Sequence, residues 1–299
     1  PILAFLEDES VTLERNKEVG NDKLIQIKMT FTWRVLSKCF RPQSTYPNQL
    51  PASTLLTLWL SADSGVSYST PTKRVDRWAD RSGSGNDVAQ STNGLKPLRY
   101  TYQDQNADNF STNQGVFNGK TRISFDKNEM DYLGAEQIQF GTPLLYPDFT
   151  IFIVAAYAFT SSAPQESFFA VEPTVSAGQM ELGQNSLASY QAIIKDASGN
   201  TITALNNTTG AQEAVLTYRL EGDTMKIYAN GVAGPNYTTA GFDATGAFMM
   251  NEFFVGAFPS IATSAADGSV AEIIIYNSAL NNFDRGKIED YLNNKYKLY

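Results

Sequence analysis

The chain has 299 residues, a formal net charge of −8, no histidine and a single cysteine. Without histidine it cannot hold a Ser-His-Asp or Cys-His relay or a histidine-ligated zinc ion. The lone Cys39 excludes an intrachain disulfide and a CxxC redox pair. Because 31 acidic residues outnumber 23 basic ones, the average surface repels phosphate backbones, and we expect no nucleic-acid partner.

The composition is that of a globular chain. Hydrophobic residues make up 42% and charged residues 18%, which predicts a large core. No run approaches the roughly 20 consecutive apolar residues that span a bilayer, so we expect no transmembrane segment. The first residues lack the basic and apolar regions of a signal peptide, and export by that route is not expected.

Residues 25–35 alternate strictly between apolar and polar side chains. This period of two predicts one long strand with a single apolar face. The strand is either an ordinary sandwich strand or an arm that lies on a partner subunit. Three prolines within residues 41–51 then indicate a linker. We therefore expect an N-terminal β arm with its linker in residues 1–50 and a folded domain in residues 51–299.

From residue 55 onward, short apolar or alternating runs are separated by turn signals such as Asn118-Gly119. The runs occupy residues 55–60, 122–125, 149–156, 167–171, 190–194, 214–220, 225–229, 252–255 and 270–276. Many short strands at this spacing predict a β-sandwich or a barrel.

One helix is predicted, over residues 282–294, with Asn281 as its N-cap. Its apolar positions include Phe283, Ile288, Tyr291 and Leu292, which gives an amphipathic helix that docks on the sandwich.

Four segments carry a family resemblance when taken in order. They are LWLSAD (58–63) with WADRSGSGND (78–87), residues 118–126, residues 222–231, and GSVAEIIIYNSAL (268–280) with IEDYLNNKY (288–296). This set resembles bacterial and phage domains of the laminin G-like, concanavalin A-like lectin/glucanase superfamily over about residues 55–299. The resemblance implies an all-β jelly-roll sandwich of two antiparallel sheets with a C-terminal helix. Such domains commonly bind glycans or proteins and less often cleave polysaccharide.

Three residues in these segments also have structural interpretations. Trp78 is expected to be a core or rim aromatic, with Asp80 closing a turn through hydrogen bonds to the backbone. Glu272 interrupts an apolar run, so it is expected to be either a buried carboxylate with a fixed partner or an outward-facing edge residue. Neither alternative makes Glu272 catalytic.

The sequence lacks the carboxylate set of a glycoside hydrolase on this scaffold. The closest match is Glu129-Met130-Asp131, but Leu133 and Gly134 stand where the third acid would be. We therefore expect no enzyme. A hydrolase with a second acid from elsewhere, or a lyase with a tyrosine base, is the remote alternative.

One loop resembles the start of a calcium site. Asp104, Asn106 and Asp108 form a D-x-N-x-D pattern whose alternate oxygens could converge on one hard cation. Asn109 replaces the turn glycine, and Gly115 stands where a bidentate glutamate is required. An ordinary Asx-rich turn is the alternative, so the expected cofactor is none or calcium.

Glycan recognition uses exposed aromatic platforms, and the candidates are Tyr100, Tyr102, Phe110 and Tyr237. The sequence thus favours a non-enzymatic structural or interaction protein of a large assembly, above all a phage or virus virion. There it would be a capsid-associated, spike or decoration protein that contacts other subunits through residues 1–50 and attaches to a host surface glycan. The alternative is a secreted or cell-surface carbohydrate-binding module.

Overall fold

The computed structural model describes residues 11–15, 27–31, 46–49, 51–101, 117–135, 148–157, 165–172, 178–185, 189–207, 213–243, 252–257 and 264–299. The chain divides between Gln43 and Ser44 into two compact units. Each unit is described by itself below.

In the N-terminal unit, β1 (Val11–Arg15) pairs antiparallel with β2 (Ile27–Phe31). β2 is the middle of the strand predicted over residues 25–35, and the rest of that prediction lies outside the described residues. β1 was not predicted. Part of the expected linker belongs to the second unit, because the Tyr276 hydroxyl donates a 2.7 Å hydrogen bond to the Pro47 carbonyl.

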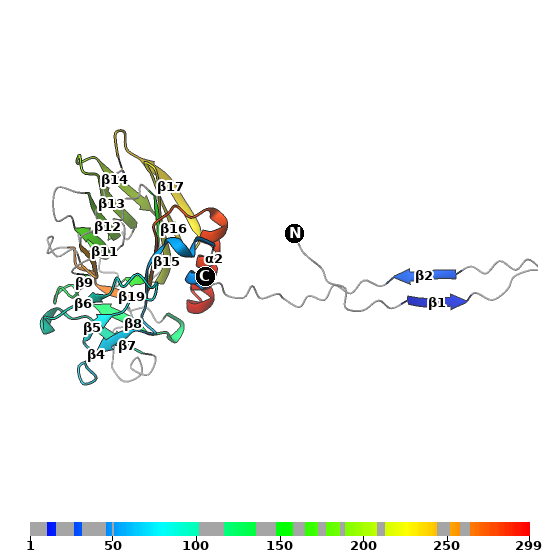
Figure 1. Ribbon diagram of the computed structural model, residues 1–299, viewed down its shortest axis with the longest axis horizontal. Coiled ribbons are helices and arrows are strands. Elements are labelled where there is room, and N and C mark those ends of the chain that lie inside the picture. Colours follow the sequence, from blue (N-terminus) through cyan, green and yellow to red (C-terminus); the bar gives the residue numbers. More distant parts are fainter. Residues whose placement is uncertain are drawn as a thin grey trace, which may run out of the picture. The chain divides into compact units, whose positions relative to one another are not determined.

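The second unit is a sandwich of two sheets, and every strand pairing described in it is antiparallel (Figure 1). The predicted fold class, two antiparallel sheets with a C-terminal helix, is therefore confirmed. The first sheet has the order β17-β16-β15-β10-β19-β8-β7, with β3 also paired to β19. Its strands are β3 (Leu56–Ser61), β7 (Leu98–Tyr100), β8 (Arg122–Phe125), β10 (Phe149–Tyr157), β15 (Glu213–Glu221), β16 (Thr224–Ala229), β17 (Val232–Thr238) and β19 (Gly268–Tyr276).

The second sheet has the order β14-β13-β12-β11-β18-β9-β6-β5-β4. Its strands are β4 (Val66–Tyr68), β5 (Val75–Trp78), β6 (Val88–Ala89), β9 (Leu133–Ala135), β11 (Gln165–Glu172), β12 (Gln179–Asn185), β13 (Tyr190–Lys195), β14 (Thr201–Asn206) and β18 (Glu252–Val255). Short 3-10 turns lie at η1 (Pro47–Gln49), η2 (Pro51–Leu55), η3 (Asn93–Leu95) and η4 (Phe117–Gly119).

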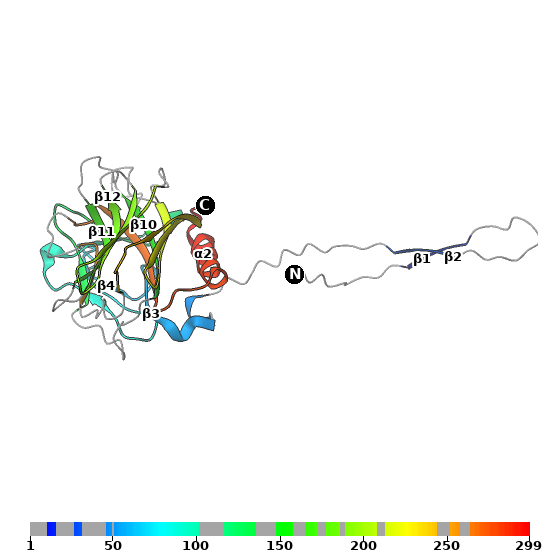
Figure 2. The same cartoon turned by 90° about the horizontal axis from the view of Figure 1, so that it is seen from above.

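The central strands of the first sheet are buried on both faces. Every residue of β10 and β19 is buried. One face, which includes Ile153, packs against second-sheet residues such as Leu182. The other face, which includes Phe152, packs under α2 (Asn282–Tyr296) (Figure 2). Burial on both faces explains why these strands read as continuous apolar runs.

The predicted helix is confirmed as α2, and the Asn281 side chain accepts hydrogen bonds from the first backbone amides as its N-cap. Within α2, the side chains of Ile288 and Leu292 are fully buried. The prediction for Phe283 was wrong, because this side chain is 69% exposed at the first turn, where the Lys287 ammonium lies 4.1 Å from its ring. Among the described residues, no helix is long and apolar enough to cross a membrane.

At one edge, backbone hydrogen bonds join the two sheets. Arg74 forms an antiparallel bridge with Leu98. Around it the Val75 amide donates to the Pro97 carbonyl at 2.8 Å, and the Arg99 amide donates to the Lys73 carbonyl at 2.9 Å. This closure places the Arg74 side chain beside the loop between β8 and β9, where the candidate site lies.

Candidate functional site

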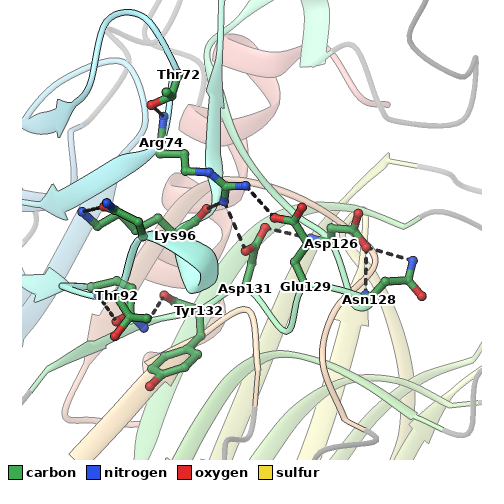
Figure 3. Close-up of polar contacts among 11 residues, drawn as sticks. Thr72, Arg74, Thr92, Lys96, Asp126, Asn128, Glu129, Asp131 and Tyr132 are labelled. Atoms are coloured by element: carbon green, nitrogen blue, oxygen red, sulfur yellow. Dashed lines mark hydrogen bonds and ion pairs between the residues drawn. The ribbon is translucent and has the colours of Figure 1, made fainter.

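Arg74 ties three chain segments together at this closed edge (Figure 3). One guanidinium nitrogen donates to the Lys96 carbonyl oxygen at 2.8 Å, and the other donates to Glu129 Oε2, also at 2.8 Å. Lys96 Nζ in turn donates to Asp76 Oδ1 at 2.7 Å. The loops that carry Lys96 and Glu129 are thereby fixed to the edge of the sandwich.

Asp131 is the most deeply buried side chain of this cluster, with 2% of its surface exposed. Its Oδ2 accepts a 3.3 Å hydrogen bond from the Asp126 amide, and its Oδ1 lies 4.0 Å from Arg74 Nη1. Burial raises the pKa of Asp131 to about 7, and the neighbouring Glu129 and Asp126 carboxylates act in the same direction, whereas Arg74 opposes them. Asp131 is therefore a carboxyl group that titrates near neutral pH in a chain without histidine.

The Glu129 and Asp131 carboxylates do not have the placement of the hydrolase pattern. That pattern needs alternate residues on one strand, but these two lie at a turn, with Met130 at a φ of +54° between them. Glu129 is engaged in its ion pair with Arg74, while Asp131 is buried. In this arrangement the ion pair between Arg74 and Glu129 holds the β8–β9 loop against the edge of the sandwich.

Directly after Asp131, an aromatic pair lies on the outer face of the second sheet. The rings of Tyr132 and Phe254 are 5.8 Å apart at an interplanar angle of 75°, and both side chains are partly exposed. Phe254 lies opposite Gly134 in the β18–β9 ladder, and a Cβ on Gly134 would come within 3.0 Å of the Phe254 ring. The missing side chain makes room for the ring, so this glycine allows the aromatic pair to form.

The backbone below this pair is fixed by polar contacts. Gln90 Nε2 donates to the Tyr132 carbonyl oxygen at 3.5 Å, and Gln90 Oε1 accepts from the Thr92 amide at 3.0 Å. Figure 3 shows Tyr132 directly after Asp131, whose carboxylate faces Arg74. We define the Tyr132–Phe254 platform as these two side chains above Gly134.

Sequence reasoning did not identify this platform. Its two residues lie far apart in the chain, and their contact depends on the pairing of β18 with β9. The one local signal was Gly134 within an otherwise apolar strand, which often marks a close approach by another group.

The structure describes two of the four aromatic residues predicted to bind glycan. Tyr100 is buried, with 4% of its surface exposed, and Lys73 and Arg122 lie 5.5 Å and 5.6 Å from its ring. The prediction of Tyr100 as an exposed platform was wrong, because β7 turns this side chain inward. Tyr237 is half-buried on β17 and packs against the core. Tyr102 and Phe110 lie outside the described residues.

The predicted calcium ligands Asp104, Asn106 and Asp108 also lie outside the described residues. In the part of the chain that is described, no group of three or more Asp, Glu, His or Cys side chains is arranged to hold a metal ion.

Glu272 is fully buried, which confirms the first of its two interpretations. Its carboxylate accepts hydrogen bonds from Trp59 Nε1 at 2.6 Å, the Tyr291 hydroxyl at 2.9 Å and the Tyr296 hydroxyl at 2.7 Å. Lys295 Nζ lies 2.7 Å from its second oxygen. Four donors from β3 and α2 thus satisfy the charge, and the carboxylate anchors the helix to the sheet.

The Trp78–Asp80 turn is also structural, as expected. Trp78 is fully buried. Asp80 Oδ1 accepts from the Trp59 and Ser82 amides, and Oδ2 accepts from the Asn86 amide at 3.0 Å.

A second carboxyl group with a raised pKa lies elsewhere in the sandwich. Glu166 on β11 is 5% exposed. Burial raises its pKa to about 7, with a further contribution from Asp267, while Lys127 opposes the shift. Lys127, from the same β8–β9 loop as Asp131, forms a 3.4 Å ion pair with Asp267.

Comparison with known proteins finds similarity at the level of the fold. The binding domain of Paraclostridial Mosquitocidal Protein 1 has a TM-score of 0.51 and 12% identity, covering 81% of this chain and 53% of that one. The receptor binding domain of botulinum neurotoxin mosaic serotype C/D has a TM-score of 0.54 and 12% identity, covering 80% and 51%. The similarity shows a shared β-sandwich fold.

The chain spans about half the length of these two solved structures. No family model matches the sequence, and no curated protein matches it.

Proposed function

We propose that this chain is a non-enzymatic binding protein of a large assembly that displays a concanavalin A-like sandwich for attachment to a surface glycan or receptor. The observation that carries the proposal is the Tyr132–Phe254 platform. Sugar rings present C–H-rich faces that pack on aromatic rings, and fixed polar groups nearby orient them. This platform is partly exposed and stands on a sheet whose edge is fixed by Arg74.

Three features support binding rather than catalysis. Of the two carboxylates considered for hydrolysis, Glu129 is paired with Arg74 and Asp131 is buried. The fully buried Glu272 carboxylate already contacts four donors, so none of its oxygens is left for a substrate. The fold is also one that receptor-binding domains use, as the botulinum neurotoxin structure illustrates.

The separate N-terminal unit favours a protein of a larger assembly over a free carbohydrate-binding module. We place the chain on a phage or virus particle, with the sandwich displayed and the N-terminal unit as its attachment. Electron microscopy of particles from the native source, labelled with antibodies against the sandwich, tests this placement. Label confined to soluble protein or to cell surfaces would contradict it and favour the module.

A glycan array probed with the full chain tests the binding role. We expect a defined set of glycans to bind the wild type and to lose binding in Phe254→Ala. The matched control is Phe283→Ala, since Phe283 is an exposed phenylalanine on α2, which covers the other sheet. Binding that disappears equally in both variants, or no binding to any glycan or to host cells, would contradict the proposal.

A further inference from the structure

The sequence contains three Asn-Gly pairs, Asn93–Gly94, Asn118–Gly119 and Asn230–Gly231, and the structure describes all of them. An asparagine before glycine is chemically labile, because the next backbone nitrogen can attack the side-chain carbonyl and glycine has no Cβ to obstruct the approach. The side-chain amide must swing onto that nitrogen for the reaction to occur. The reactivity of each pair therefore depends on what holds the asparagine side chain.

Two of these pairs have closely similar backbone angles. Asn118 and Asn230 have φ angles of +50° and +51°, and the glycines that follow them have φ angles of +72° and +75°. Asparagine and glycine adopt this left-handed conformation more readily than other residues. Because the φ angles match, we expect any difference in reactivity between these two pairs to come from the asparagine side chains.

The Asn230 side chain is held by the neighbouring strand. Its Oδ1 accepts a 2.9 Å hydrogen bond from the Val215 amide, while its own backbone amide donates to the Val215 carbonyl at 2.8 Å. Rotation of the side chain toward the next backbone nitrogen would break the first of these bonds. Asn93 is held as well, because its Oδ1 accepts from Lys96 Nζ at 2.8 Å.

The Asn118 side chain is exposed and is not held in this way. Within the part of the chain that the structure describes, its side-chain amide has no hydrogen-bond partner. The turn itself is well anchored, since the Lys120 amide donates to the Phe117 carbonyl at 3.0 Å and the Phe117 amide donates to Glu213 Oε1 at 3.2 Å. Asn118 thus combines a fixed turn with a side chain that can rotate.

We propose that Asn118 is a site of spontaneous covalent modification, at which the side-chain amide is lost as ammonia. The Gly119 backbone nitrogen gives up its proton and bonds to Cγ of Asn118. The bond from Cγ to Nδ2 breaks, and ammonia leaves with that proton. Water then opens the resulting succinimide ring at one of its two carbonyls, which yields aspartate or isoaspartate. The inference stands independently of the proposed binding role.

The two products should affect the fold differently. Aspartate tolerates the left-handed conformation of this turn and adds only a negative charge. Isoaspartate also lengthens the backbone by one methylene directly after Phe117, which is fully buried and lies edge-on to the Tyr296 ring at 6.0 Å. We therefore expect the isoaspartyl form to unfold at a lower urea concentration than the aspartyl form.

Peptide mass spectrometry of the full chain after incubation at mildly alkaline pH tests the proposal. We expect Asn118 to convert at least about tenfold faster than Asn230 in the folded protein, because Asn230 must first break its hydrogen bond to Val215. Asn93 should also convert more slowly than Asn118. In concentrated urea the difference between Asn118 and Asn230 should disappear. Equal rates in the folded protein, or a difference that persists in urea, would overturn the proposal.

Two variants assign the product to its site. Asn118→Gly suits a φ of +50° and should remove the main acidic form that ion-exchange chromatography resolves after incubation. Asn230→Gly is the matched control, because it makes the same change at a φ of +51° and should leave that acidic form in place. An acidic form that survives in Asn118→Gly would contradict the assignment.

Discussion

Replacing Asp131 by asparagine should make the protein more stable at alkaline pH than the wild type. Asp131 has an ordinary pKa of 3.8 and a folded-state pKa of about 7. The folded state therefore holds this proton more tightly than the unfolded state does. The stability that the protonated group contributes is fully present below pH 4 and is lost as pH rises through 7.

The size of the effect follows from the shift. A displacement of about 3 pH units at about 1.4 kcal/mol per unit gives an upper limit of about 4 kcal/mol at pH 8 and above. Relaxation around the charge and attraction by Arg74 reduce it, so we expect about 2 kcal/mol. Asparagine keeps the shape and an acceptor for the Asp126 amide, and it cannot ionise.

Urea unfolding of both proteins at intervals from pH 5 to pH 8.5 measures this difference. We expect the advantage of Asp131→Asn to grow from pH 5 to about pH 7 and to level off above pH 7, because the unfolded state has largely lost this proton throughout that range. Glu221→Gln is the control, since Arg219 lowers the pKa of Glu221 and its effect should be constant over this range. A difference between wild type and Asp131→Asn that does not vary with pH would refute the reasoning.

Three further predictions concern the scaffold, each measured by urea unfolding at a fixed pH. Glu272→Gln should cost about 2 kcal/mol, because it removes the buried one of the two carboxylates that neutralise the Lys295 ammonium, while Asp63 remains 3.0 Å away; a loss below about 0.5 kcal/mol would contradict this. Gly183→Ala should cost more than about 3 kcal/mol, since its Cβ would lie 1.7 Å from the Glu166 carbonyl oxygen, and an unchanged midpoint would exclude such close packing. Asn281→Ala should cost about 1 kcal/mol through loss of the N-cap, with Asn281→Ser retaining most of the stability because its hydroxyl oxygen can accept from the same backbone amides; equal losses in both would argue against capping.

The central strands and the helix could be predicted from sequence because each carries a local pattern. β10 and β19 are continuous apolar runs, and α2 has apolar residues at helical spacing, Ile288, Tyr291 and Leu292, together with a capping residue. β4, β5, β6, β7, β9, β12, β14 and β17 were missed. Many of these are short or carry few apolar residues, as in β12, which has only Met180 and Leu182 as large apolar side chains. Their strand character comes from pairing with neighbours and not from their own composition.

The candidate site was less predictable for the same reason. Glu129 and Asp131 were noticed as a carboxylate pair, but the burial of Asp131 and its proximity to Arg74 depend on the bridge between Arg74 and Leu98. Tyr100 was misplaced because a three-residue strand has too little pattern to reveal which face is inward. A chain without histidine has no side chain whose unperturbed pKa lies between 5 and 8, but burial gives two carboxyl groups a pKa in that range.

The central claim is that the sandwich binds a surface ligand through the Tyr132–Phe254 platform. Isothermal titration of the strongest glycan from the array into wild type, Phe254→Ala and Phe283→Ala tests it most directly. We predict an affinity reduced at least about tenfold in Phe254→Ala, corresponding to about 1.4 kcal/mol, and unchanged in Phe283→Ala. Equal affinities for wild type and Phe254→Ala would contradict the account.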